Sequence, residues 1–383
     1  MSQQNRTTTL LLRGTLVLGA LGVVAAFLKA SPARFWANWI LWFVLLFTVA
    51  MGSLFLVALE HLVNAKWSVP IRRVPERVAT LILPAIPMGL IALGALPVLY
   101  PGTRPDAIHN AILAGKAFWL GAPFFSVRVV VSFALMLLGL AVLVGGSLKQ
   151  DRSLDPAFNV RARKFAPAFM GMFALVITLV AFDWLSGLTP EWYSDIFGVY
   201  LFAGAFLGGL AATSLSVLYL QRQNRLEGVR NDHLYNLGGF LFAFTVFWSY
   251  IGFAQYMLMW YANLPDEVIY FQTRLTGGWH VVTVMLAFLH FVMPFFALVT
   301  RDAKGDGSRL RKVAALMLAA HVLDIYWLIF PILPGGPHFS WPELGFALFF
   351  LSLALLWVRG ALEKGEDMPV GDPFLQEGLE FRL

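Results

Sequence analysis

The sequence predicts an all-α polytopic membrane protein that crosses the bilayer ten times. Three observations predict it: a mean hydropathy of +0.72, a charged fraction of only 13%, and ten separate apolar stretches of bilayer length. A hydrocarbon core of about 30 Å is crossed by about 20 helical residues, and each stretch meets or approaches that length. The stretches are Leu10–Leu28, Phe35–Leu59, Ala79–Tyr100, Val127–Leu148, Phe165–Leu185, Ile196–Leu220, Leu234–Tyr261, Trp279–Thr300, Leu310–Phe330 and Pro342–Leu362.

The stretches are continuous, which predicts helices rather than the alternating strands of a membrane β-barrel. Arg6 and Arg13 flank the start of the first stretch and no small-residue cleavage site follows, so we expect a retained helix rather than a signal peptide. Because no segment of soluble-domain size separates the stretches, 1–383 is predicted to be one integral membrane domain. It comprises an N-terminal segment 1–9, ten helices within 10–362, and a polar tail 363–383.

The basic residues sort to one side of this predicted topology. With ten spans both termini share a side, and that side carries 22 of the 28 Lys and Arg residues, including those of the polar loops Glu60–Val78 and Lys149–Lys164. The other side holds Lys29, Arg34, Arg104, Lys116, Arg128 and Arg274. The positive-inside rule therefore predicts that both termini are cytoplasmic. The net charge of +6 reflects this sorting and does not indicate nucleic-acid binding.

Cysteine is absent from the chain. This excludes disulfides, thiolate-bound iron–sulfur clusters and covalently attached c-type haem. If the protein takes part in electron transfer, the metal centres are expected on partner proteins or on histidine.

Three ionisable residues lie deep within the predicted spans. His321 and Asp324 fall in the ninth span, one helical turn apart and so on one helix face. His290 falls at a similar depth in the eighth span. An ionisable residue near the bilayer centre costs about 2.5–3.5 kcal/mol on insertion scales, so each of the three is a candidate functional residue.

Further ionisable residues lie closer to the surfaces. Glu60 and His61 close the second span on the cytoplasmic side, and Asp183 closes the fifth span near the outside. By depth, these residues and the central three form a ladder across the membrane that suits a proton relay. The alternative is that His321 and Asp324 pair with each other or with hydroxyl groups and only lock helices together.

Two other classes of function remain open at this point. His290 and His321 meet the minimum requirement for ligating a b-type haem, although adjacent helices do not favour that geometry. A secondary transporter would carry Gly or Pro interruptions at matching positions of two halves. Pro84, Pro87 and Pro97 interrupt the third span and Pro294 the eighth, and these do not form a matching pair.

Several segments of the second half carry a resemblance to a known family. They are Phe182-Asp-Trp184, Trp192-Tyr-Ser-Asp-Ile-Phe-Gly-Val-Tyr200, Phe247-Trp-Ser-Tyr-Ile-Gly-Phe-Ala-Gln-Tyr256, Trp260-Tyr-Ala-Asn-Leu-Pro-Asp-Glu267, Gly277-Gly-Trp279, His290-Phe-Val-Met-Pro-Phe-Phe296 and His321-Val-Leu-Asp-Ile-Tyr-Trp-Leu328. Together they resemble the NrfD-like membrane subunits of alternative complex III, a quinol:electron acceptor oxidoreductase, and in particular the second, quinone-binding-type subunit. Before Arg163 the resemblance is looser and rests on the ten-helix plan and on His61-Leu-Val-Asn-Ala-Lys-Trp67.

The resemblance implies two four-helix bundles, spans two to five and six to nine, with the first and last helices outside them. It implies a place in a bacterial cytoplasmic membrane beside a homologous quinol-oxidising subunit, an iron–sulfur protein, multihaem and monohaem cytochrome c subunits, small membrane subunits and lipids. Haem c and iron–sulfur clusters would then sit on these partners. The chain would be a membrane subunit and candidate proton path, with no metal or cofactor of its own.

Direct binding of menaquinol from the outer leaflet is the main alternative within this family. Asp183, Arg274, Trp279 and His280 lie near the outer boundary and could supply an aromatic wall and hydrogen-bonding groups. The sequence therefore gives proton-path candidates (Glu60, His61, Asp183, His290, His321 and Asp324) and a separate set for a quinone.

Overall fold

The computed structural model describes residues 3–383, which form helices and turns without a strand in that range. Within it, ten helices or helix series are long and apolar enough to cross a membrane, which confirms the predicted all-α architecture. Six of them are single helices: α1 (Gln3–Lys29), α2 (Pro32–Leu62), α11 (Phe197–Gln221), α12 (Asn231–Ala262), α17 (Gly307–Ile329) and α18 (Trp341–Leu362).

The other four spans are series of shorter segments. The third comprises α3 (Val69–Ala79), α4 (Ile82–Ala92), η1 (Leu93–Ala95) and α5 (Leu96–Leu99), and the fourth comprises α8 (Ala122–Gly139), η4 (Leu140–Val144) and α9 (Gly145–Ser153). The fifth comprises α10 (Ala157–Val180), η5 (Ala181–Leu185) and η6 (Ser186–Leu188). The eighth comprises α14 (Trp279–Ala287), η7 (Phe288–Val292) and α15 (Met293–Leu298).

Contacts between the helices form two groups of four. Helix α2 packs against the third and fifth spans, and α8 packs against α4 and α10. In the second group, α11 packs against α12 and α17, while α14 and α15 pack against α17. Helices α1 and α18 pair with each other outside these groups, and α18 also contacts α2. This arrangement agrees with the two bundles and two peripheral helices that the resemblance implies.

The two bundles meet along α2 and α11, where glycines let the backbones approach closely. A Cβ atom at Gly52 would lie 2.0 Å from the backbone oxygen of Ala205, and one at Gly209 would lie 2.5 Å from the carbonyl carbon of Gly52. Small residues of this kind promote helix association in lipid, because close packing rather than the hydrophobic effect holds helices together there.

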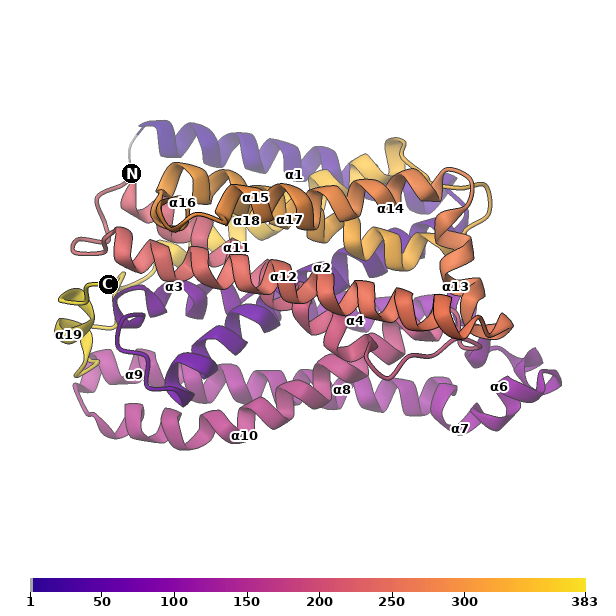
Figure 1. Cartoon of the computed structure of the whole chain (residues 1–383), viewed down its shortest axis with the longest axis horizontal. Helices are drawn as coiled ribbons and strands as arrows, with labels where there is room; N and C mark the ends of the chain where they lie inside the picture. The colour runs from indigo at the N-terminus through magenta and orange to yellow at the C-terminus, as the bar shows by residue number, and fades with distance from the viewer. Residues whose placement is uncertain (1–2) are drawn as a thin grey trace.

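The start of α1 and the end of the chain lie at one end of the bundle, here called the terminal face (Figure 1). The other end, here called the opposite face, carries the short helices α6 (Ala111–Gly115) and α7 (Ala117–Leu120) and the helix α13 (Pro265–Leu275). An even number of spans requires the two termini to share a side, and the structure agrees. Met1 and Ser2, part of the predicted cytoplasmic segment 1–9, lie outside the described residues.

The segment Glu60–Val78, predicted as a polar loop, contains the helix α3 instead. All residues of α3 are buried, including Arg72, Arg73, Glu76 and Arg77. The charges are tolerated because they are paired: Arg73 with Glu76 and Asp151, and Arg77 with Asp367. A charge count alone could not reveal this, since two of the partners lie about 80 and 290 residues further along the chain.

Candidate functional site

Three of the six predicted proton-path residues meet in the second bundle. His321 and Asp324 project from α17 and His290 from η7, and one potential ligand atom from each lies within 4.8 Å of the others. The exposed fraction of their side chains is 0–1%. We call His290, His321 and Asp324 the central cluster.

The Asp324 carboxylate accepts hydrogen bonds on both oxygens from two other helices. The Tyr200 hydroxyl of α11 donates to Oδ1 at 2.5 Å, and the Trp248 indole Nε1 of α12 donates to Oδ2 at 3.2 Å. Such charge-assisted bonds are stronger than neutral ones and hold the carboxylate in place. Depth and charge do not reveal either donor because neither residue is charged, although both lie in the segments that carry the family resemblance.

His321 contacts the first bundle through Thr48 of α2. Its Nε2 lies 3.0 Å from Thr48 Oγ1, and the Thr48 hydroxyl donates to the Leu45 carbonyl at 3.0 Å. A hydroxyl has one proton to donate, so this arrangement assigns the hydrogen to His321 Nε2 and leaves Nδ1 as an acceptor. His321 Nδ1 is buried without a partner among the described residues.

Two glycines of α11 make room for the His321 ring. A Cβ atom at Gly204 would lie 3.2 Å from His321 Cε1, and one at Gly208 would lie 3.0 Å from His321 Cδ2. Both distances are shorter than ordinary carbon contacts, so larger residues there would displace the imidazole.

The His290 ring is held by stacking rather than by hydrogen bonds. It lies 3.9 Å from the Trp248 ring with an interplanar angle of 25°. Both of its ring nitrogens are buried without a partner in the described part of the chain. His290 sits in the π-helical segment η7, and π-helical turns occur frequently at functional sites. One imidazole N–H and one lone pair are therefore available inside the bundle.

The central cluster could offer a metal ion two imidazole nitrogens and a carboxylate oxygen. Both Asp324 oxygens already accept hydrogen bonds from Tyr200 and Trp248. A carboxylate has about four lone-pair sites, so these two bonds are compatible with a proton site and with metal coordination alike.

A cavity of about 600 Å³ lies against the central cluster on the α12, α13, α14 and α17 side. Tyr200 and Trp248 line it and simultaneously bind Asp324, so they separate the cavity from the carboxylate. The lining is mostly aromatic and aliphatic, and it includes Gln255, whose buried Nε2 has no hydrogen-bond partner in the described structure.

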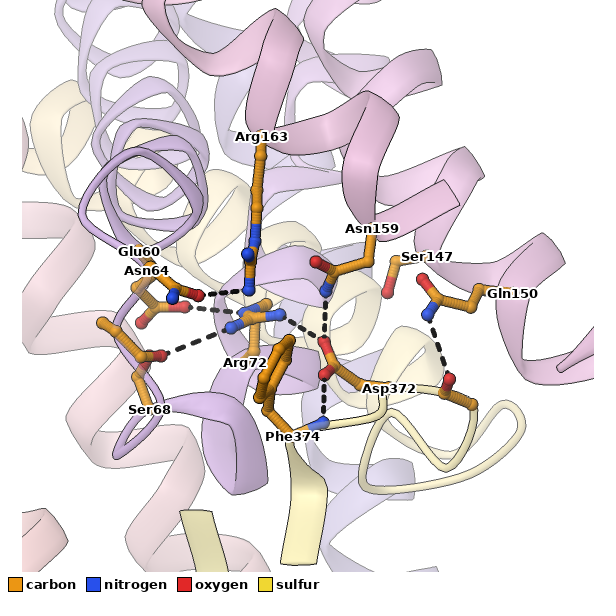
Figure 2. A network of polar contacts seen from close by, with 12 residues as sticks. Glu60, Asn64, Ser68, Arg72, Ser147, Gln150, Asn159, Arg163, Asp372 and Phe374 are labelled. Atoms are coloured by element: carbon orange, nitrogen blue, oxygen red, sulfur yellow. Dashed lines mark hydrogen bonds and ion pairs between the residues drawn. The ribbon is translucent and has the colours of Figure 1, made fainter. Parts of the chain in front are cut away.

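Glu60 belongs to a different network, at the terminal face (Figure 2), and His61 lines a small pocket beside it. Arg72 Nε donates to Glu60 Oε2 at 3.3 Å, while Arg72 Nη1 donates to Asp372 Oδ2 of the C-terminal tail at 2.7 Å. Glu60 Oε1 and His61 Nε2 are buried and lack partners among the described residues. The tail thus packs onto the protein and covers this pair, an arrangement with no signal in the local sequence.

Asp183 forms an ion pair in the first bundle. Arg128 Nε lies 3.1 and 2.9 Å from its two oxygens, and Arg128 Nη2 lies 2.8 Å from Oδ1. The guanidinium also packs 4.1 Å from the ring centroid of Trp119. The described hydrogen bonds therefore assign Asp183 to this pair and not to the central cluster.

The four residues proposed for a quinone do not converge on one cavity. None of them lines the 600 Å³ cavity. Asp183 pairs with Arg128, Trp279 packs against Tyr326, and the exposed His280 contacts the Gly277 carbonyl. Arg274 is buried and donates to backbone carbonyls. These residues lie near one end of the spans but contact different partners.

Comparison with known proteins adds no identification to this geometry: no family model matches the chain, and no curated protein matches it.

Proposed function

We propose that this chain is a proton-handling membrane subunit of a quinol-oxidising electron-transfer complex. The central cluster carries the proposal, because two histidines and a carboxylate are buried together between helices at mid-span. Intramembrane ionisable residues of this kind mark proton relays and ion pathways. The resemblance to NrfD-like subunits of alternative complex III supports the assignment to such a complex.

The hydrogen bonds favour exchange of a proton within the cluster. His321 Nδ1 and both His290 nitrogens have no partner in the described structure, while Asp324 is held by Tyr200 and Trp248. Imidazole and carboxylate side chains can each take up and release a proton. Thr48 connects His321 to α2 of the first bundle, the helix whose last turn carries Glu60 and His61. Those two residues would exchange protons with the cytoplasm, and bound water would bridge them to the cluster.

Asp324→Asn in the assembled complex tests the proposal. The variant keeps the size and one acceptor oxygen but cannot accept and release a proton. We expect assembly and quinol oxidation by the neighbouring subunit to persist while the number of protons moved per electron in vesicles falls. Asp266→Asn, an exposed change in α13, is the matched control. A normal ratio in a fully assembled Asp324→Asn complex would refute the role. Purification of the chain alone, without haem and iron–sulfur partners, would instead favour a transporter.

Direct menaquinol binding is a second candidate, and the 600 Å³ cavity is the observation that favours it. An aromatic cavity with a few polar groups is typical of sites for apolar ligands. Gln255 Nε2 could donate to a ligand oxygen, and Tyr200 would connect that oxygen with Asp324. We expect Gln255→Leu to lower the menaquinone content of the purified protein, whereas Gln272→Leu, an exposed change in α13, would not. Equal quinone content in both variants would refute binding at this cavity.

A further inference from the structure

Arg274 is a buried cation without a carboxylate partner. Its exposed fraction is 2%, and no acidic side chain among the described residues forms an ion pair with it. The other buried or half-buried arginines at the opposite face do have such partners: Arg34 pairs with Glu343 at 2.5 Å and Arg128 with Asp183 at 2.8 Å. A buried charge without a counter-ion is costly, so Arg274 calls for an explanation.

Backbone carbonyls and aromatic rings satisfy Arg274 only in part. Nε donates to the Trp327 carbonyl at 3.2 Å, Nη1 to the Tyr270 carbonyl at 2.9 Å, and Nη2 to the Leu328 carbonyl at 3.0 Å. A guanidinium has five N–H donors, so two remain. Burial lowers the pKa of Arg274 from its ordinary value, but a guanidinium remains protonated in proteins. The positive charge therefore persists.

A cavity of about 330 Å³ lies beside Arg274, between the outer ends of the two bundles. Trp192 also lines this cavity, with an exposed fraction of 3%, and its indole Nε1 is buried without an acceptor in the described structure. The Trp192 ring stacks 3.8 Å from the Tyr270 ring, and the Tyr270 ring in turn lies 3.5 Å from the Arg274 guanidinium. A buried donor without an acceptor is destabilising, and a ligand acceptor would offset that cost.

The charges at the mouth of this cavity are compatible with an anion. Lys116 Nζ donates to the carbonyl of the lining residue Pro190 at 2.8 Å. The lining carboxylate of Glu191 is exposed and accepts a hydrogen bond from Asn110 at 3.0 Å. The charged groups near the site are therefore two cations, Arg274 and Lys116, and one exposed carboxylate, Glu191.

We propose that this cavity binds an anionic oxygen group, with Arg274 supplying the charge and the Trp192 indole donating a hydrogen bond. The phosphate of an anionic lipid and a free anion share this chemistry. The lipid is the better match, because the side chains of Leu113, Leu188, Ile269 and Ile332 line the same cavity and would contact the hydrocarbon next to a head group. The proposal does not depend on proton movement by the central cluster.

Trp192→Phe is the test, because it removes the indole N–H and keeps an aromatic ring to stack on Tyr270. Thermal unfolding of the full-length protein, in the complex in which it purifies, is measured in three settings. These are phosphatidylglycerol nanodiscs, phosphatidylcholine nanodiscs, and phosphatidylcholine nanodiscs with added inorganic phosphate. Lys29→Gln, an exposed change at the opposite face, controls for general electrostatics.

We expect phosphatidylglycerol to stabilise the wild type and Lys29→Gln more than phosphatidylcholine does. In Trp192→Phe the apparent affinity for phosphatidylglycerol should fall about tenfold, which corresponds to the loss of one hydrogen bond to a charged group. Without the anion the variant should be as stable as the wild type or more so, since a buried donor without an acceptor has been removed. If inorganic phosphate alone gives the Trp192-dependent stabilisation, the anion site is supported and its ligand is a free anion. Equal responses of wild type and Trp192→Phe to both anions would overturn the proposal.

Discussion

Tyr200 and Asp324 are 124 residues apart in the sequence, and the Tyr200 hydroxyl donates a 2.5 Å hydrogen bond to Asp324 Oδ1. Trp248 donates to the other oxygen, so α11 and α12 each hold the carboxylate of α17. The same three residues therefore join three helices of the second bundle, and two of them, Tyr200 and Trp248, form the wall between the central cluster and the aromatic cavity. Structural and chemical roles of Asp324 need separate tests.

Asp324→Leu and Asp324→Asn should differ in stability. Leucine leaves the Tyr200 hydroxyl and the Trp248 indole without an acceptor, at a cost of about 1–3 kcal/mol for each donor. Asparagine keeps one acceptor oxygen and should lose less. The free energy of unfolding in detergent micelles measures the difference. Equal stability of the two variants would show that the hydrogen bonds do not hold the helices together.

Asp183 is expected to act through its ion pair and not as a proton carrier. Asp183→Leu leaves the buried Arg128 guanidinium without a counter-ion and should cost about 3–5 kcal/mol of folding free energy. The double variant Arg128→Met/Asp183→Leu should recover stability to within about 1 kcal/mol of the wild type, because an apolar pair can replace a buried ion pair. Its proton-to-electron ratio should be normal. A lowered ratio in the stable double variant would place Asp183 on the proton path.

The depth of each residue in the membrane, deduced from its position in a predicted span, identified the central cluster but not the side chains that contact it. His290, His321 and Asp324 were found because ionisable residues are rare within spans, and their i,i+3 spacing placed two of them on one face of α17. Depth does not determine which way a helix faces. Depth alone therefore could not show that Asp183 binds Arg128, or that the four quinone-binding candidates have different partners.

Charge count was misleading for α3. Four charged residues in eleven indicate a solvated loop, whereas the structure buries all four and pairs the three arginines with partners from distant segments. No rule based on one local window can find a partner about 300 residues away, such as Asp372 for Arg72. The ten spans were predictable because length and apolarity are local properties.

Membrane topology can be tested directly because the chain has no native cysteine. We expect Tyr193→Cys, at the exposed turn between the fifth and sixth spans, to react with a membrane-impermeant maleimide in intact cells. Glu227→Cys, between the sixth and seventh spans, should react only after permeabilisation. The physical basis is the sorting of basic residues to the terminal face. The reverse labelling pattern would contradict cytoplasmic termini.

The C-terminal tail should contribute to folding through Asp372. Its carboxylate accepts from Arg72 at 2.7 Å and from Asn159 at 2.8 Å, and the Arg72 and Asp372 side chains are only 5% and 4% exposed. Arg72 keeps its ion pair with Glu60, so Asp372→Ala leaves two buried donors, Arg72 Nη1 and the Asn159 amide, without an acceptor and should cost about 1–3 kcal/mol of folding free energy for each.

Glu377→Ala is the matched control in the same tail. Glu377 pairs with Lys66 at 2.6 Å, but the two side chains are 55% and 39% exposed. An exposed pair of this kind contributes about 0–1 kcal/mol, so this variant should unfold nearly like the wild type. Denaturant titration of both variants in micelles gives the comparison. If both lose the same stability, burial gives the Arg72–Asp372 pair no greater weight than the exposed Lys66–Glu377 pair. If neither loses any, the tail is held by its apolar packing and not by these ion pairs.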